Sequence, residues 1–382
     1  MYEAMEAEFM NRRAFILGGL GLIGTAVGGG VCFINQPKFG RLPSGDRLAR
    51  IQASPHYIDG RFQCLEPVDI MTSQKPENRF LATFKFIMRD KSGLFPKQLM
   101  LSKKTDLLTL PRSENVLIWL GHSSFYMQLN GWRILIDPVF SNYGSPIFFI
   151  NKAFPGSNIY TADDFPEIDV LAITHDHWDH LDYASVMALK PKVKHIVCPL
   201  GVGEYFEQWN FDLDNLHEED WYTEIKLSKD FSIHILPSQH FSGRFLTTNP
   251  TEWCSFAFVT PKLKVFCSGD GGYGDHFKDI GNRFNGFDLA IMENGQYNEN
   301  WHKIHLMPEE TAQATVDVKA KQLVTSHNGK FALAMHSWNE PFNVMTYMSK
   351  DKPYERLTPM IGETVYIGRP GQVFDNWWIE ME

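Results

Sequence analysis

The sequence predicts an α/β protein in which two mixed sheets carry helices on their outer faces. Compact apolar runs bounded by Gly, Pro and Asp begin at Val116 and are typical of strands. The runs at 124–129 and 132–137 are separated by Asn-Gly, a strong hairpin signal. Later runs alternate with stretches that have a polar face, as helices between strands do. Hairpins come first along the chain and strand–helix alternation follows.

Ten runs are predicted strands, and one helix between them is well marked. We expect this helix over 308–320, because Pro308 and the acidic residues after it suit a helix N-terminus. The predicted strands lie, in chain order, at 116–120, 124–129, 132–137, 170–174, 195–199, 232–237, 255–260, 264–269, 288–292 and 322–327.

An apolar segment precedes this region. Residues 14–34 carry no charge and directly follow Arg12 and Arg13. The run is long enough for a membrane span, and its basic flank also resembles a twin-arginine export signal. We therefore expect 1–35 to be a signal or membrane anchor, with a buried N-terminal helix or lipidation at Cys32 as alternatives. Residues 36–104 show only short periodic pieces and are expected to form an arm that packs on the main domain.

Composition restricts the classes of function. The chain has 382 residues, of which 43% are hydrophobic, so it can bury a large core and is not disordered. A net charge of −9 argues against a nucleic-acid partner held by a broad basic surface. Five cysteines without paired spacing argue against a disulfide framework. The oligomeric state is not encoded in any pattern that we recognise.

The segment VLAITHDHWDHLD predicts a metal site. It places His175, His177, Asp179 and His180 within six residues after a predicted strand. Side chains at 175 and 177 point the same way if the strand continues, and a turn can bring the other two back. Core packing explains this set poorly, because each group would need a buried partner. Imidazole and carboxylate groups are ligands that suit Zn²⁺. The alternative to a metal site is a polar surface loop in which the histidines occur by chance.

Three further residues follow predicted strands and are candidate ligands for a second metal. His240, Asp270 and His327 each stand where a strand gives way to a loop, a common position for ligands in α/β proteins. A carboxylate such as Asp270 can bridge two metals. A single histidine at a strand end is more often structural, so the prediction depends on the whole set.

In this order the ligands resemble those of the metallo-β-lactamase fold family. The resemblance implies a four-layer αββα sandwich over 105–345, with 346–382 extending the same domain. It implies the following ligand sets: His175, His177 and His240 for one metal, and Asp179, His180 and His327 for the other, with Asp270 shared.

Flanking motifs are similar to one branch of that family, which contains N-acyl-phosphatidylethanolamine phospholipase D. The motifs are WLGHSSF, LIDPVFS, QHFSGR, SGDGGYGDHF, HLMPEET and HSWNEP. The stretch QPKFGRLPSGDRL resembles bacterial members, so the match extends over nearly the whole chain. We expect association with a bacterial inner membrane on its periplasmic side, although the charges on both flanks of 14–34 leave the orientation open. Asn328 and Lys330 stand where that branch usually has Trp and Thr, so the wall near the second metal is expected to differ.

Four residues near the ligands are expected to assist them. Arg244 can grip a phosphate with its planar guanidinium, although a salt bridge that fixes its loop is the alternative. His305 is expected to reach the substrate. His122 is expected near the metals, where it orients a ligand, contacts substrate or is structural. Asp137 is expected to support a metal-bound histidine or to cap a turn.

The predicted activity is that of a dinuclear zinc hydrolase, with Mn²⁺ or Fe²⁺ as other metals that fit. The sequence has no GxSxG, Walker or strand-associated GxGxxG motif. Two metals would instead lower the pKa of a shared water to about 7. Asp179 would orient this water, with Asp270, His305 and Arg244 as the other catalytic residues.

The resemblance implies a phosphodiesterase that acts on N-acylphosphatidylethanolamine-type lipids or small phosphodiesters, held at the membrane by 14–34. A lactonase or other carbonyl hydrolase on the same fold is the alternative. A redox di-iron protein is disfavoured, because all three histidines of the first cluster are present.

Overall fold

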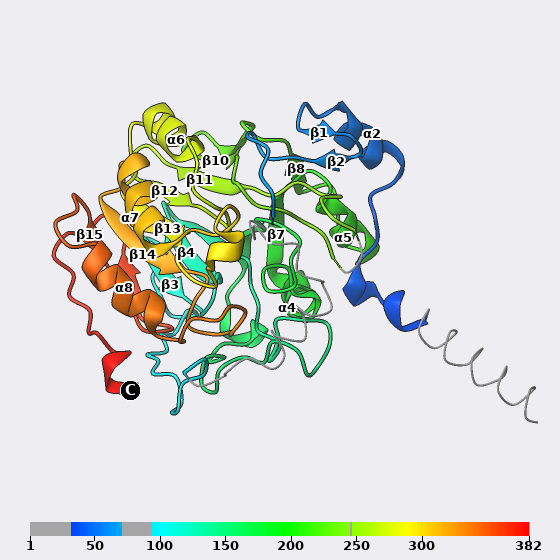
Figure 1. Cartoon of the computed structure of the whole chain (residues 1–382). Coiled ribbons are helices and arrows are strands. Elements are labelled where there is room, and N and C mark those ends of the chain that lie inside the picture. The colour runs from blue at the N-terminus through cyan, green and yellow to red at the C-terminus, as the bar shows by residue number, and fades with distance from the viewer. Residues whose placement is uncertain (1–31, 71–92, 245–246, 382) are drawn as a thin grey trace, which may run out of the picture.

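The computed structural model describes residues 32–70, 93–244 and 247–381. Two seven-stranded sheets form its centre (Figure 1). The first sheet has the order β16 (Thr364–Tyr366), β3 (Val116–Trp119), β4 (Phe125–Leu129), β5 (Trp132–Ile136), β6 (Ile168–Ala172), β7 (Val193–Pro199) and β8 (Leu216–Glu219). The second has the order β15 (Glu355–Arg356), β14 (Gln322–Ser326), β13 (Leu289–Glu293), β12 (Lys264–Cys267), β11 (Ser255–Val259), β10 (Phe231–Leu236) and β9 (Glu224–Ser228).

Both sheets combine antiparallel hairpins with parallel crossovers. In the first sheet β3, β4 and β5 are antiparallel, and β5 to β8 are parallel. In the second sheet β9 to β12 are antiparallel, and β12 to β15 are parallel. The predicted hairpin joins β4 and β5, with φ of 51° at Asn130 and 82° at Gly131, as a type I′ turn requires.

Helices cover the outer face of each sheet, and the inner faces pack on each other. On the first sheet lie α4 (Tyr183–Leu189) and α5 (Gly203–Gln208). On the second lie α6 (His276–Phe284), α7 (Pro308–Asp317) and α8 (Glu340–Met348), on the opposite side of the molecule in Figure 1. Because strands such as β4 and β13 are buried on both faces, they appear as continuous apolar runs. The predicted αββα sandwich is confirmed.

The predicted helix after Pro308 is present but ends earlier than expected. It stops at Asp317 rather than at 320. Lys319 has a φ of 56°, and Ala320 forms a bridge with Phe287 that leads the chain into β14. A left-handed residue cannot continue a right-handed helix, so the chain leaves α7 there. The described short 3₁₀ turns are η1 (Pro37–Phe39), η2 (Ala162–Asp164), η3 (Lys190–Lys192), η4 (Glu299–Trp301) and η5 (Ile379–Met381).

The described part of the N-terminal arm contacts the first sheet. It consists of η1, α2 (Gly45–Ala53) and a small hairpin of β1 (Tyr57–Ile58) and β2 (Arg61–Phe62). Arg47 on α2 pairs with Glu204 of α5 at 2.8 Å and with Glu218 of β8 at 2.9 Å. Both carboxylates are buried, so these ion pairs tie the arm to the domain.

The predicted anchor falls largely outside the described residues. Of the run 14–34, the structure describes only residues 32–34. Within the described ranges, no helix has the length and apolar character needed to cross a membrane.

Candidate metal centre

The seven predicted ligands gather at one edge of the sandwich, in loops that follow strands. The first sheet supplies four of them from the loop after β6, and the second supplies one each after β10, β12 and β14. The carboxyl ends of parallel strands meet at the same edge, which is why residues far apart in sequence converge here. His240 joins them because β10 runs in the same direction as β12, each being antiparallel to β11.

One group consists of His175, His177 and His240. Their ligand atoms all lie within 4.8 Å of one another. Nδ1 of His177 is 2.9 Å from Nε2 of His175 and 3.2 Å from Nε2 of His240. Burial lowers the pKa of all three imidazoles, to about 4 for His177. The rings are therefore neutral, the form that binds a metal.

A second group consists of His122, Asp179, His180 and His327, whose ligand atoms also lie within 4.8 Å of one another. Oδ2 of Asp179 is 3.4 Å from Nε2 of His327 and 2.8 Å from Nε2 of His122. His122 is fully buried, and burial lowers its pKa to about 3. It therefore orients Asp179 as a neutral donor.

Asp270 lies between the two groups. Its Oδ2 is 3.1 Å from Nε2 of His180, 3.0 Å from Nε2 of His327 and 3.9 Å from Nε2 of His240. These contacts place one carboxylate against histidines of both predicted metal positions. The structure therefore places Asp270 between the two groups of histidines.

Two buried polar atoms support a metal at this place. Nε2 of His180 and Oδ1 of Asp270 have no hydrogen-bond partner in the described part of the chain. A buried polar group without a partner costs about 1–3 kcal/mol, so such groups are rare in native proteins. A divalent cation held at this place would give both atoms a partner. The donors are imidazoles and carboxylates, which fit the metals predicted from the sequence.

In His180 and His240, one ring nitrogen points away from the centre and its hydrogen bond fixes the orientation of the ring. Nδ1 of His180 lies 2.8 Å from Oδ2 of Asp137, which also accepts from Thr174 Oγ1 at 2.5 Å. Nδ1 of His240 lies 2.9 Å from the carbonyl of Ile304. In both residues the remaining nitrogen faces the centre, as in metal sites with a supporting second partner. Asp137 therefore occupies the supporting position expected from the sequence.

Glu293 belongs to the site but was missed by the sequence interpretation. It ends β13, is fully buried, and its Oε1 contacts Nδ1 of His305 and, at 3.0 Å, Nδ1 of His327. Its Oε2 accepts from the backbone N–H of Gly271 at 2.7 Å. A carboxylate at the end of an apolar strand, beside the strands that precede Asp270 and His327, was an available signal.

His305 stands at the mouth of the centre. Its ring stacks on His327 with centroids 5.2 Å apart and planes at 8°, and it meets His240 edge to face at 5.0 Å. Its side chain is 13% exposed, and it lines a cavity that a substrate can enter. A cavity of about 250 Å³ lies beside it, lined by Ile70, His177, Asp179, Phe241, Asp270, Gln296, Trp301, Ile304, His305, His327 and Leu333.

Arg244 is not part of this site, and the predicted phosphate contact is wrong. Its guanidinium is buried and donates to the backbone carbonyls of Asp176 at 2.6 Å, Lys38 at 3.0 Å and Leu181. It also stacks over Trp178 at 4.2 Å. Because the planar fork is used by these carbonyls, it cannot grip a substrate in the metal centre. It fixes the loop after His240, although through carbonyls rather than a salt bridge.

Known proteins are similar to this chain in sequence and in fold. A family model described as a beta-lactamase superfamily domain matches residues 132–328. The chain is 32% identical over 331 residues to an uncharacterized protein of Mycobacterium tuberculosis, with 86% of this chain and 88% of that protein covered.

Two further similarities extend this comparison. Over 265 residues the chain is 32% identical to a mitochondrial N-acyl-phosphatidylethanolamine-hydrolyzing phospholipase D of Saccharomyces cerevisiae, covering 64% of this chain and 54% of that protein. A solved metallo hydrolase from Ignicoccus hospitalis has a TM-score of 0.50 at 19% identity, covering 66% of this chain and 97% of that one. At this identity the structural match concerns the fold.

Proposed function

The chain belongs to the β-lactamase superfamily and is a metal-dependent hydrolase, and we propose that it hydrolyses phosphodiesters as a phospholipase D does. The proposed substrate is N-acylphosphatidylethanolamine or a related phospholipid. The observation that carries the proposal is the cavity beside His305, where apolar side chains such as Phe241 and Trp301 stand next to the clustered ligands. An acyl chain fits the apolar wall, and a phosphodiester anion fits a pair of cations. The similarity to the yeast phospholipase supports this choice.

We infer two zinc ions per chain, with Asp270 shared between them. His175, His177 and His240 would hold one, and Asp179, His180 and His327 would hold the other. Such ions lower the pKa of water to supply the nucleophile and neutralise the charge that develops on the phosphoryl oxygens. The residues of the chain hold the reacting groups in place. Asp179, oriented by His122, aligns the attacking water, and the ring of His305 contacts the substrate at the cavity mouth.

His305 is proposed to donate the proton that the leaving alcohol requires. The attacking water forms a new P–O bond, the bond to the alcohol oxygen breaks, and that oxygen takes a proton. The buried carboxylate of Glu293 holds Nδ1 of His305, so Nε2 is left to face the substrate. Products are a phosphatidic acid and an N-acylethanolamine.

Association with the membrane completes the proposal. We infer that the uncharged run 14–34 holds the enzyme at a bacterial inner membrane, on the periplasmic side. An anchored enzyme meets lipid at a higher effective concentration than a free one.

The test is metal analysis of the purified full chain together with product analysis. We expect about two zinc ions per chain, release of N-acylethanolamine from the lipid, and loss of turnover in chelator. His305→Ala should lower kcat by about 10²–10⁴-fold. His302→Ala is the matched control, because His302 lies three residues earlier and does not line the cavity.

Other outcomes would replace the proposal. Turnover of a lactone without turnover of any phosphodiester would make the enzyme a carbonyl hydrolase. Activity in metal-free protein would remove the metal mechanism altogether. Manganese or iron in place of zinc would correct the cofactor and leave the reaction as proposed.

A further inference from the structure

The loop after β5 carries an exposed apolar tip. It closes as a hairpin, with Tyr143 bridged to Lys152 and the N–H of Gly144 donating to the carbonyl of Asn151 at 2.9 Å. At its tip Phe148 is 75% exposed and Phe149 is 70% exposed. Their rings contact each other at 5.2 Å, edge to face. Neither ring belongs to a hydrophobic core cluster of the described chain.

The base of this loop packs against a side chain of the metal centre. A Cβ on Gly144 would lie 3.4 Å from Cβ of Asp179 and 3.3 Å from the ring of Phe331. Phe331 in turn packs on His122 with centroids 5.1 Å apart. The apolar tip is therefore carried by a hairpin whose base touches a predicted ligand.

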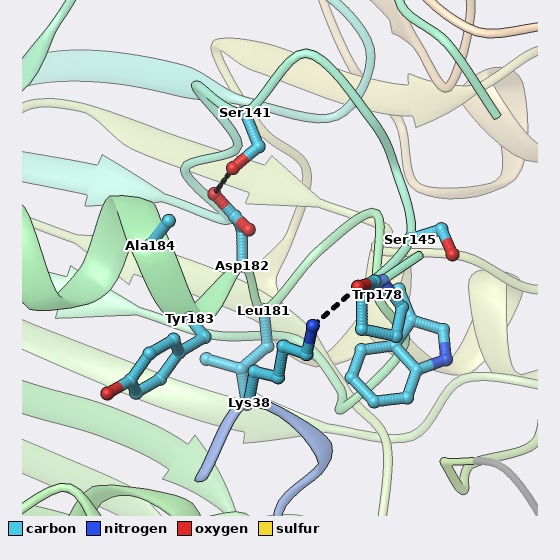
Figure 2. A pocket seen from close by; sticks show the side chains of 9 residues that line it. Lys38, Ser141, Ser145, Trp178, Leu181, Asp182, Tyr183 and Ala184 are labelled. Carbon is cyan, nitrogen blue, oxygen red and sulfur yellow. Dashed lines mark hydrogen bonds between the residues drawn. The ribbon is translucent and has the colours of Figure 1, made fainter. Parts of the chain in front are cut away.

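The same loop contacts the segment through which the N-terminal run enters the fold. Nζ of Lys38 donates to the carbonyl of Pro146 at 3.0 Å, across a small cavity of about 150 Å³ that Trp178 also lines (Figure 2). Phe33 packs on Phe39 at 5.1 Å, and Phe39 packs on Trp178 at 5.7 Å.

The uncharged run therefore ends beside the loop. Phe33 and Ile34 are its last residues, and both are exposed. Residues 1–31 lie outside the described structure, and the chain that they form joins the domain at this place. The apolar run is as long as a bilayer is thick, so an anchored chain brings this side of the domain to the lipid.

We propose that Ile147–Ile150, together with Phe33 and Ile34, form a bilayer-docking tip that inserts into the lipid–water interface. Isolated exposed apolar residues are ordinary, but several adjacent large ones mark an interaction site. The exposed Lys152 flanks the tip, and a cation beside an apolar patch suits anionic head groups. The delivery of lipid past Asp179 to the cavity rests on the proposed function. The insertion of the tip into lipid is independent of that function.

The test is hydrogen–deuterium exchange of the full chain with and without vesicles of phosphatidylethanolamine and phosphatidylglycerol. We expect amides of 145–150 to exchange about tenfold more slowly on vesicles. Because the measurement involves no turnover, it separates failure of the docking tip from failure of the proposed reaction. Unchanged exchange at 145–150 on vesicles that bind the protein would overturn the proposal.

A variant pair sharpens the experiment. Phe148→Ser with Phe149→Ser should abolish the protection of 145–150, while the N-terminal run still holds the chain on the vesicle. Tyr347→Ser is the matched control, because Tyr347 is an aromatic residue of α8 that is 76% exposed and lies outside the tip. Equal protection in the double variant would contradict insertion.

Two other occupants would give distinct results, and each would overturn the proposal. If residues 1–31 cover the tip, 145–150 will be protected without vesicles, and deleting those residues will remove the protection. If a second copy covers it, protection without vesicles will increase with protein concentration. The wild-type chain alone decides between lipid and these alternatives, so the result does not depend on whether a variant folds.

Discussion

Asp270 contacts histidines of both groups. It lies within 3.1 Å of His180 and His327 and faces His240 at 3.9 Å. Asp137 contacts only one of these histidines, on the outward ring nitrogen. The two aspartates are both buried, but they differ in whether they face the metal positions.

This difference predicts unequal effects of substitution. Asp137→Ala should lower metal affinity or activity by about 10–100-fold, as loss of a supporting carboxylate usually does. Asp270→Ala should abolish turnover and loosen both metals. Metal content after dialysis and kcat/KM measure both effects. Asp288→Ala is the control, since that carboxylate pairs with Lys321 at 2.8 Å outside the centre and should leave metal content unchanged. Near-normal metal content in Asp270→Ala would refute the shared-ligand assignment.

The burial of Lys330 predicts that the free energy of unfolding depends on pH. Its ammonium is fully buried and donates to the carbonyl of Val139, and burial lowers its pKa from 10.5 to about 7. Between these two values the unfolded chain keeps the proton and the folded chain does not, so stability rises with pH. The penalty of the buried charge is complete below about pH 7 and disappears toward pH 10.5.

Lys330→Met removes this penalty. The variant should be more stable than the wild type at neutral pH, and the difference should shrink by about 1.4 kcal/mol for each pH unit above 7. Urea unfolding at several pH values measures the difference. Lys321→Met, at a largely exposed site, should follow the wild-type dependence. A constant offset between Lys330→Met and wild type at all pH values would show that burial does not depress this pKa.

Residue types alone were sufficient to predict which seven side chains gather, but not every neighbour. Histidines and aspartates crowded after strands have few structural explanations, and the structure brings all seven together. Arg244 was misplaced because four positions along a loop do not determine the direction of a side chain. Glu293 was missed because a single carboxylate after a strand resembles an ordinary strand end until its neighbours in space are known.

At the scale of elements, hydrophobic patterns located the inner strands of both large sheets and missed the edge strands β8, β9, β15 and β16. Runs such as 132–137 became strands with shifts of one or two residues, because burial on both faces requires continuous apolar sequence. β15 and β16 have two and three residues, too few for a pattern. The pairing of β16 with β3 could not be predicted either, because partner choice over such a distance depends on packing rather than on local sequence.

The hydrogen bonds of Arg244 predict how much stability is lost when two loops are no longer connected. Its guanidinium ties the segment after β10 to the carbonyls of Asp176 and Leu181 in the turn after β6. Arg244→Ala leaves these buried carbonyls without a donor and should lower the free energy of unfolding by about 3 kcal/mol. Arg244→Lys should rescue little, because one ammonium cannot replace a fork that reaches three carbonyls. Thermal or urea unfolding measures the loss.

The kinetic readout separates this role from a phosphate contact. In folded Arg244→Ala, KM for a phosphodiester should stay close to the wild-type value. Arg283→Ala is a control for an exposed arginine that stacks on Tyr222, and it should change stability far less. A large rise in KM without loss of stability would restore the phosphate contact.

At the scale of the whole molecule, the metal centre joins two halves of the sandwich. The first sheet supplies the four ligands between His175 and His180, and the second supplies His240, Asp270 and His327. The distance between these sets depends on how the sheets pack, so the sequence predicted which residues meet but not their spacing. An unfolded chain cannot present both sets together, and the metals therefore bind the folded state preferentially.

Metal removal should accordingly destabilise the entire fold. With free metal at about 1,000 times the dissociation constant, binding contributes about 4 kcal/mol to the free energy of unfolding. Chelator should remove this contribution and shift the unfolding midpoint of the wild type and of Asp288→Ala alike. In Asp270→Ala the same chelator should shift the midpoint much less, because that variant has already lost the shared ligand. Identical wild-type midpoints with and without chelator would mean that the two halves pack at full strength without metal, and that the centre serves only the reaction.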